Sequence, residues 1–113
     1  MALQTAEKIV IITEKIIYKG ICDILERYGA SGYTVVPAGG KGSRAFRSTS
    51  ERASVVDDFA NIKVEVIVKD KALGEAIMRD IDTKYFTHYS GITYLDTVEI
   101  LRADKFHPSH EFQ

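Results

Sequence analysis

The chain has 113 residues, a length that forms one domain and buries enough surface for a hydrophobic core without disulfides. Its 15 Lys and Arg residues are offset by 16 Asp and Glu residues, and the net charge of −1 excludes a protein that binds polyanions over its whole surface. The single cysteine, Cys22, excludes an internal disulfide and a four-cysteine zinc site, and we expect a partly buried, unreactive thiol.

The first part of the chain predicts a strand, a helix and a second strand. Residues 8–13 form a continuous, mostly β-branched run typical of a strand, and Thr13 can cap the helix that follows. That helix should end near Gly29, because its apolar residues recur at steps of three and four up to this point. The residues of this apolar stripe are Ile17, Ile21, Ile24, Leu25 and Tyr28. Residues 32–36 then form the second strand.

The later part repeats this order. Residues 62–68 alternate between apolar and largely polar side chains, which predicts a strand with one buried face. Asp70 ends this strand and is a candidate cap for a second helix, in which Gly74 is a mild flaw. The inner stripe of this helix comprises Leu73, Ala76, Ile77, Ile81, Lys84 and Tyr85. A turn at residues 88–91 leads into a fourth strand over residues 91–100.

The order β-α-β, long loop, β-α-β predicts an α+β fold, the ferredoxin-like βαββαβ sandwich, in a single domain over residues 1–113. Two helices would cover one face of a four-stranded antiparallel sheet. The other face would expose aliphatic side chains, so we expect self-association, for which a closed ring of three sheets is one solution. The longest aliphatic run, residues 9–12, is too short to cross a membrane, and the first residues lack the features of a signal peptide. We therefore expect a cytoplasmic protein.

A polar insertion over residues 37–58 separates the second and third strands, and its first part has the composition of a phosphate site. Connections longer than about 12–15 residues are usually functional or disordered. Three glycines allow backbone N–H groups to converge on an anion, namely Gly39, Gly40 and Gly42. Lys41 adds a mobile charge, while Arg44 and Arg47 can form paired hydrogen bonds with phosphate oxygens. The alternative to a phosphate site is a flexible hairpin tip, whose charged side chains only keep it soluble.

A second glycine turn lies at residues 89–92. We expect it at the same sheet edge as the end of the second strand, so that the two connections line one cleft. The backbone groups of Gly91 and Ile92 would then hold a base or ribose, while the loop carrying Arg44 and Arg47 closes on the phosphate. The alternative is an ordinary glycine that terminates the preceding helix.

Other polar residues give weaker signals. His107 and His110 have the spacing of metal ligands, but Pro108 disfavours the helix that would align them, and we expect a frayed terminus there. His88 has no acidic partner in the sequence and is interpreted as a surface residue. The two aspartates at positions 57–58 either ligate a divalent cation or only end the loop.

Four segments together resemble the SbtB-type PII-like signalling proteins of cyanobacteria. They are KIVIITEKI near the start, GASGYTVVPAGGKGSRAFRS through the second strand, NIKVEVIV after the loop and KYFTHYSGITYLDTVEIL towards the end. The resemblance covers nearly the whole chain. Its most specific part is the segment GGKGSR, which is followed, after two intervening residues, by Arg47.

This resemblance implies a homotrimer that binds adenine nucleotides in the clefts between its subunits. The ligands that it implies are cyclic AMP, AMP, ADP and ATP, with Ca²⁺ or Mg²⁺ as an option alongside ATP. It also implies a T-loop at about residues 39–58 and a C-terminal tail at about residues 102–113. The residues that match the family's nucleotide contacts are Lys41, Gly42, Ser43, Arg44 and Arg47 in the T-loop, Asn61 after it, and Tyr89, Gly91 and Ile92 in the turn called the B-loop.

The resemblance further implies a regulator of the sodium-dependent bicarbonate transporter SbtA, within the carbon-concentrating mechanism. Such a protein would be cytoplasmic, would meet the transporter through its T-loop, and would reach the inner membrane only by that contact. We expect an allosteric switch and no enzyme, since the sequence contains no paired catalytic carboxylates and no nucleophile elbow. Some relatives carry a cysteine-bearing hairpin at the C-terminus that is tied to nucleotide hydrolysis. No cysteine is present in this tail, so we expect no thiol switch there.

Two other functions remain open from the residues alone. A nucleic-acid-binding ferredoxin-like module would need exposed aromatic side chains on its sheet, and residues 62–66 provide no such stacking platform. A weak nucleotide hydrolase would need a divalent metal, for which Asp57 and Asp58 are the candidate ligands.

Overall fold

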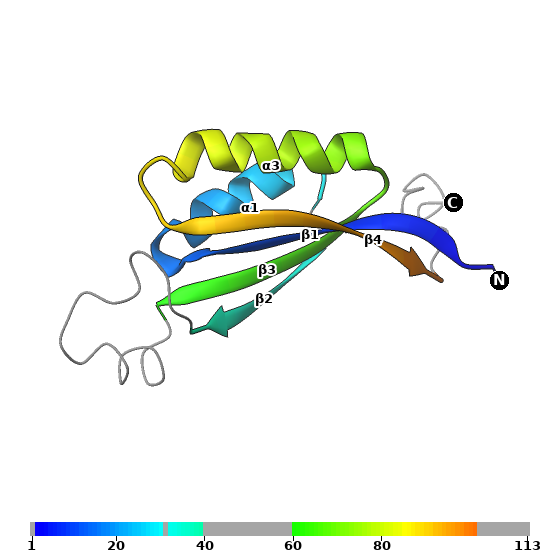
Figure 1. Ribbon diagram of the computed structural model, residues 1–113, viewed down its shortest axis with the longest axis horizontal. Helices are drawn as coiled ribbons and strands as arrows, with labels where there is room; N and C mark the ends of the chain where they lie inside the picture. Colours follow the sequence, from blue (N-terminus) through cyan, green and yellow to red (C-terminus); the bar gives the residue numbers. More distant parts are fainter. Residues whose placement is uncertain (1, 31, 40–59, 102–113) are drawn as a thin grey trace.

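Strands and helices alternate along the chain in the predicted order (Figure 1). The computed structural model describes residues 2–30, 32–39 and 60–101. Its elements are β1 (Gln4–Glu14), a short 3-10 helix η1 (Lys15–Ile17), α1 (Tyr18–Arg27), β2 (Tyr33–Ala38), β3 (Asn61–Val68), α3 (Lys71–Tyr85) and β4 (Gly91–Ile100). Within the described part, no helix has the length and apolar character needed to span a bilayer. Most of the predicted T-loop and the whole predicted tail lie outside the described residues.

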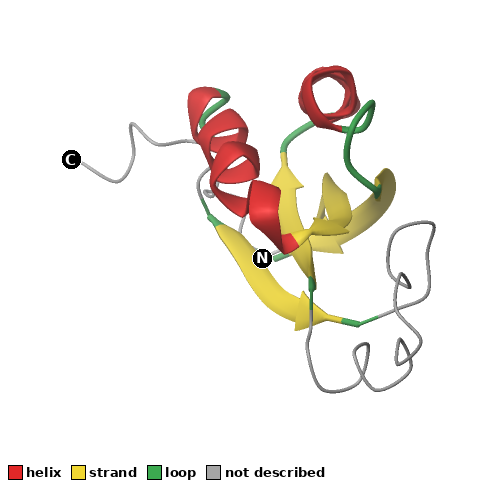
Figure 2. Ribbon diagram, turned by 90° about the vertical axis from the view of Figure 1, so that its left-hand side faces the viewer, coloured by secondary structure: helices red, strands yellow, loops and turns green. Residues whose placement is uncertain are grey.

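The four strands form one antiparallel sheet in the order β2-β3-β1-β4, which is the order of the ferredoxin-like fold. Figures 1 and 2 show both helices on one face of this sheet, so the predicted fold class is confirmed. β4 covers the predicted residues. β1 begins earlier than predicted, because its first residues pair with the end of β4, where Gln4 lies opposite Ile100.

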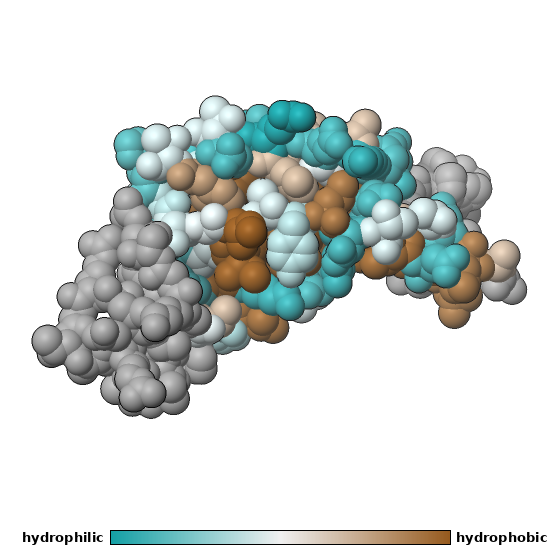
Figure 3. Space-filling view, viewed as in Figure 1, coloured by the Kyte–Doolittle hydropathy of each residue, from teal (hydrophilic) through white to brown (hydrophobic). Residues whose placement is uncertain are grey.

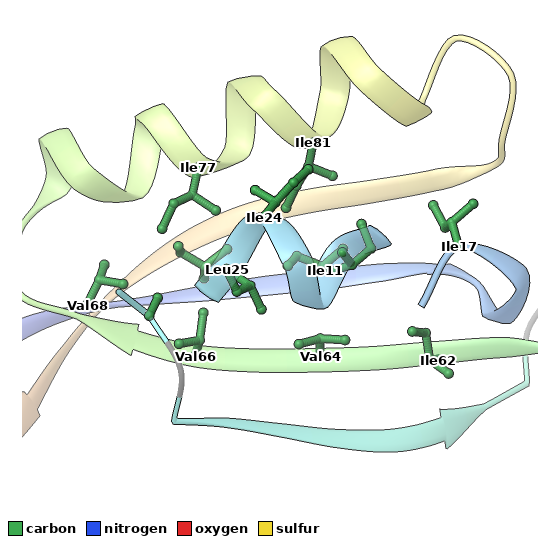
Figure 4. Close-up of a cluster of buried hydrophobic side chains, with 13 residues drawn as sticks. Ile11, Ile17, Ile24, Leu25, Ile62, Val64, Val66, Val68, Ile77 and Ile81 are labelled. Carbon is green, nitrogen blue, oxygen red and sulfur yellow. The ribbon is translucent and has the colours of Figure 1, made fainter. Parts of the chain in front are cut away.

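The core lies between the helices and the sheet. The apolar stripes of α1 and α3 meet the inner side chains of β1 and β3 (Figure 4). Every second residue of β3 is buried, as the predicted period of two requires. The buried cluster comprises Ile9, Ile11, Ile17, Ile21, Ile24, Leu25, Ala30, Ile62, Val64, Val66, Val68, Ile77 and Ile81. Burial of this many branched side chains provides the main favourable free energy of folding.

The ends of the helices confirm two predictions and contradict one. Asp70 caps α3, since its Oδ1 accepts the N–H of Leu73 at 2.9 Å. Gly29 follows α1 with a φ of 77°, which is the left-handed conformation expected at a helix end. The prediction that Thr13 caps the first helix is wrong. Thr13 lies within β1, and its hydroxyl donates to the carbonyl of Ser90 instead.

Two helical glycines allow close packing. Gly74 is buried in α3, and an added Cβ would lie 2.8 Å from Cδ1 of Leu95 on β4. The glycine predicted as a mild flaw therefore permits the helix to approach the sheet. At Gly20 in α1, an added Cβ would overlap the hydroxyl of Tyr85 at the end of α3. The two helices meet again where the Tyr28 hydroxyl donates to Asp80, a hydrogen bond that raises the pKa of Tyr28.

Replacing Gly20 with alanine should destabilise the protein, although alanine favours a helix interior over glycine by about 1 kcal/mol. The added methyl group overlaps the Tyr85 hydroxyl, and overpacking of this kind typically costs about 1–3 kcal/mol. Chemical denaturation of Gly20→Ala, Tyr85→Leu and the double variant would measure the free energies of unfolding. We expect the double variant to lose less than the sum of the two single losses. A Gly20→Ala variant more stable than the parent protein would contradict the predicted overlap.

The sheet face opposite the helices is only partly polar. Strand register places Val10 of β1, Tyr94 of β4 and Glu65 of β3 on this face, and Ile67 and Ile92 share it by alternation. Tyr94 and Ile92 remain 38% and 57% exposed. Figure 3, which views the molecule from the side of α3 and β4, shows apolar side chains gathered beneath α3 among hydrophilic neighbours. The expectation of apolar side chains on the open face is therefore confirmed.

Candidate functional site

The ends of all four strands that adjoin the predicted loops lie at one end of the sheet. Glu14 at the end of β1 lies opposite Asn61 at the start of β3, and Asn61 lies opposite Ala38 at the end of β2. On the other side of β1, Thr13 lies opposite Gly91 at the start of β4. Two of the predicted contact residues, Asn61 and Gly91, are thus brought to the same end of the molecule.

The turn between α3 and β4 is fixed to β1 through both backbone groups of Ser90. The Thr13 hydroxyl donates to the Ser90 carbonyl at 2.8 Å, and the Ser90 N–H donates to the Glu14 carboxylate at 2.6 Å. Thr13 is 2% exposed, so its hydrogen bond is shielded from competing water. Because β1 is an inner strand of the sheet, these two bonds attach the turn to a rigid element.

Gly91 is glycine for a steric reason. An added Cβ would overlap the ring of Phe86 and would lie 2.8 Å from the Thr13 hydroxyl oxygen. Its φ is not positive, and α3 has already ended at Tyr85. The alternative of an ordinary helix-terminating glycine is therefore excluded. The turn packs against β1 so closely that a side chain at this position would push the two apart.

A cleft of about 450 Å³ borders this turn, between α3 and the edge strand β4. This volume lies within the range of small-molecule sites. The side chains that α3 contributes are mostly charged, and those near the turn are mostly apolar. The lining residues are Glu75, Met78, Arg79, Asp82, Phe86, Gly91, Ile92 and Thr93. The cleft thus combines apolar surface with groups that can form hydrogen bonds.

The strand order separates the two predicted halves of the site. β2 and β4 are the outer strands of the sheet, and β3 and β1 lie between them. With neighbouring strands about 4.8 Å apart, Ala38 and Gly91 lie about 14 Å from each other across the sheet. The expectation that these two strand ends share one edge is therefore wrong, because they share an end of the sheet but lie on opposite sides of it.

Comparison with known families identifies the chain. The family model for the nitrogen regulatory protein P-II matches residues 6–105. The chain belongs to the P-II family. A PII-like signalling protein from Thermus thermophilus is 33% identical to this P-II chain, with 93% of this chain and 98% of that chain covered and a TM-score of 0.72. The predicted membership of the PII-like proteins is thus confirmed.

Two further structures are of CPII, a PII-like protein from Thiomonas intermedia. CPII bound to ADP, AMP and acetate is 27% identical to this P-II chain, with 94% of this chain and 98% of that chain covered and a TM-score of 0.74. CPII bound to ADP and bicarbonate is 25% identical, with 88% and 91% covered and a TM-score of 0.71. These likenesses place the nucleotide complexes of CPII on the same fold as this P-II chain.

The predicted contact residues of this P-II chain differ in what can be described. Asn61 is half-buried at the start of β3, while Gly91 and Ile92 are exposed at the start of β4. Tyr89 turns its ring towards the core, edge-on to Tyr85 with 6.2 Å between ring centroids. The T-loop candidates lie outside the described residues, namely Lys41, Gly42, Ser43, Arg44 and Arg47.

The minor candidates have a simpler outcome. His88 is exposed, as predicted, and Cys22 is buried. Asp57, Asp58 and the histidines of the tail lie outside the described residues. In the part of the chain that the structure describes, no group of three His, Cys, Asp or Glu residues could hold a metal ion.

Sequence reasoning missed the roles of Thr13 and Glu14, together with the α3 side of the cleft. The predicted topology contained one usable signal, because it already places the end of the first strand beside the start of the fourth. The hydrogen bonds to Ser90 have no signature in the sequence, since they join residues 76 and 77 positions apart.

Proposed function

We propose that this protein is a PII-like signalling protein that binds adenine nucleotides and passes their binding on to a membrane transporter. The observation that supports this most directly is the glycine turn at Gly91, held to β1 and bordered by a cleft of ligand size. The ADP and AMP complexes of CPII provide the nucleotide class. A fixed turn beside a cleft of this size suits the ribose or base of a nucleotide, because little ordering is needed on binding.

The complete site would lie between subunits of a homotrimer. The Gly91 turn and the β2 end of one chain lie on opposite sides of the sheet, so a ring of sheets would bring the turn near the loop base of a neighbour. The apolar residues of the open sheet face, including Tyr94 and Ile92, support such a ring, because closure would bury them.

We assign the phosphate to the T-loop base and the remainder of the nucleotide to the turn. Arg44 and Arg47 would form charge-assisted hydrogen bonds with phosphate oxygens, and Lys41 would add a third cation. The other assigned contacts are Gly42, Ser43, Asn61, Tyr89, Gly91 and Ile92. The proposed ligands are cyclic AMP, AMP, ADP and ATP, the last with or without Ca²⁺ or Mg²⁺.

The switch itself would be the T-loop. Fixing a segment of this glycine- and serine-rich composition costs roughly 1–2 kcal/mol per residue, and a bound phosphate offsets part of that cost. Ligands with different phosphates would therefore favour different loop conformations. We propose that the rest of the loop, with Phe46, Val55 and Val56, contacts the bicarbonate transporter SbtA and recruits this cytoplasmic protein to the inner membrane. This assignment of the partner follows the SbtB-type resemblance of the sequence.

Replacing Arg44 or Arg47 with alanine should weaken nucleotide binding while the trimer persists. Hydrogen bonds to charged groups contribute about 1.5–3 kcal/mol, so each loss should raise the Kd by about tenfold to a hundredfold. Isothermal titration calorimetry with cyclic AMP, AMP, ADP and ATP would measure this, and light scattering would report the mass of the assembly. Arg27→Ala is the matched control, because Arg27 ends α1 away from the loop. Unchanged affinity in both loop variants would contradict the proposed phosphate site.

A further inference from the structure

The end of β1 forms hydrogen bonds with two other connections of the fold. On one side, the Thr13 hydroxyl and the Glu14 carboxylate bind the backbone of Ser90 at 2.8 Å and 2.6 Å. On the other side, the N–H of Lys15 donates to the carbonyl of Ala60 at 2.8 Å. Three consecutive residues therefore hold both the turn before β4 and the residue that leads into β3.

Both contacts lie directly beside residues to which nucleotide binding is assigned above. Ser90 precedes Gly91, which lines the cleft between α3 and β4. Ala60 is the first described residue after the long connection between β2 and β3, and it precedes Asn61. Asn61 also lies opposite Glu14 in the pairing of β1 with β3. The end of β1 thus contacts the backbone next to both assigned segments.

Glu14 connects the two contacts most directly. Its side chain accepts the Ser90 N–H, and its carbonyl carbon forms the peptide bond with Lys15, whose N–H donates to Ala60. Because a peptide unit is planar and rigid, a movement of the Glu14 backbone changes the direction of that N–H. The neighbouring Thr13 is 2% exposed, so its bond to Ser90 keeps the turn in place beside Glu14. Chains of hydrogen bonds between rigid elements can carry coupling between two sites.

Resting on the nucleotide site proposed above, we propose that Glu14 is a positioning residue that couples the Gly91 turn to the start of β3. A ligand in the cleft would fix the turn, and the turn would hold the Glu14 side chain through Ser90. The bond between Lys15 and Ala60 would then open less often. The coupling depends on the reach of the side chain and not on its charge, since the Ser90 N–H requires only an acceptor oxygen.

Amide hydrogen exchange, followed for each residue by NMR, measures how often these bonds open. Without ligand, we expect Glu14→Ala to raise the exchange rate of the Lys15 amide about fivefold, although both partners of its own bond remain. Glu14→Gln keeps the reach and should match the parent protein. Glu14→Asp keeps the charge but is one methylene shorter, and it should behave like the alanine variant. Glu7→Ala is the matched control, because Glu7 also lies in β1 and accepts the Thr97 hydroxyl on β4.

The second part of the experiment adds AMP. In the parent protein, the Ser90 and Lys15 amides should both exchange more slowly, by about fivefold or more. In Glu14→Ala and Glu14→Asp, AMP should still slow exchange at Gly91, but the Lys15 amide should no longer respond. Calorimetry would establish that AMP saturates each variant, so that a missing response does not reflect missing ligand.

The outcomes separate the coupling from the nucleotide site. If AMP slows exchange in the turn of the parent protein but not at Lys15, the coupling is overturned and the nucleotide site stands. An equal response of the Lys15 amide in Glu14→Ala overturns the role of Glu14 in the same way.

Two further results remain decisive if a variant does not fold or no ligand binds. Should Glu14→Ala and Glu14→Asp fail to fold, a folded Glu14→Gln protein whose Lys15 amide no longer responds to AMP overturns a coupling based on reach. If the parent protein binds no adenine nucleotide, the nucleotide site is wrong. The ligand-free comparison then supports or overturns the link through Glu14 by itself.

Discussion

Replacing Gly91 with valine should both destabilise the protein and abolish most of its nucleotide binding. The first atom of the new side chain would overlap the Phe86 ring and approach the buried Thr13 hydroxyl, and the two branches would extend this clash. Such overpacking typically costs about 1–3 kcal/mol of unfolding free energy. Relief by movement of the turn would break the bonds of Ser90 to Thr13 and Glu14, and we therefore expect affinity to fall by at least about tenfold.

Two further variants make this result interpretable. Ser90→Ala removes a side chain but keeps both backbone groups that bind β1, so it should leave stability and nucleotide affinity nearly unchanged. Phe86→Leu in the Gly91→Val background removes part of the ring that obstructs the new side chain, and it should recover some of the lost affinity. Denaturation curves and calorimetry would report the two effects separately. A Gly91→Val protein that keeps its stability and its affinity would show that the close approach of the turn has no functional role.

The second large effect concerns assembly. Placing charges on the open sheet face, with Ile67→Glu and Tyr94→Glu together, should convert the proposed trimer into a monomer of 12.6 kDa. Both positions lie on the face opposite the helices, where side chains of the isolated chain are partly exposed. The isolated subunit should tolerate carboxylates there, whereas closure of the ring would remove them from water at a cost of several kcal/mol each.

Light scattering would measure the mass, and circular dichroism would establish that the variant remains folded. Ile16→Glu is the matched control, because Ile16 is 77% exposed in η1 and lies away from the open face. We expect this control to keep the mass of the parent protein. If the double variant stays trimeric, the open sheet face is not the subunit interface. If nucleotide binding is lost together with the trimer, the site is completed by a neighbouring copy.

The local pattern of residues was sufficient to predict most of the architecture. Alternation in β3 and the apolar stripe of α1 depend on which face meets the core, and this is a property of sequence spacing. Asp70 caps α3 because its bond reaches only three residues along the chain. Gly29 ends α1 through its own backbone conformation, a φ of 77°, which is likewise a local property. Short-range effects of this kind are encoded within a few neighbouring residues.

Contacts between residues that are far apart in the sequence could not be predicted from the local pattern of residues. Thr13 is of a residue type that often caps helices, but its hydroxyl donates to the carbonyl of Ser90 instead. Only the pairing of β1 and β4 brings these two residues close. The sequence pattern predicts that Gly74 weakens its helix, whereas the structure shows that Leu95 of the sheet lies where a side chain at this position would be. In both cases, packing between elements overrode the local preference, because a buried polar group or a steric overlap involves more free energy than an intrinsic propensity.

Residue patterns alone were enough for the fold class, most element boundaries and the suspicion that glycine-rich connections bind a nucleotide phosphate. The folded arrangement was needed to show why Gly91 lacks a side chain, that the Glu14 carboxylate accepts the Ser90 N–H, and that β2 and β4 end on opposite sides of the sheet. The physical reason is that hydrophobic periodicity depends on spacing along the chain, whereas a site depends on distances between residues that strand order alone brings together.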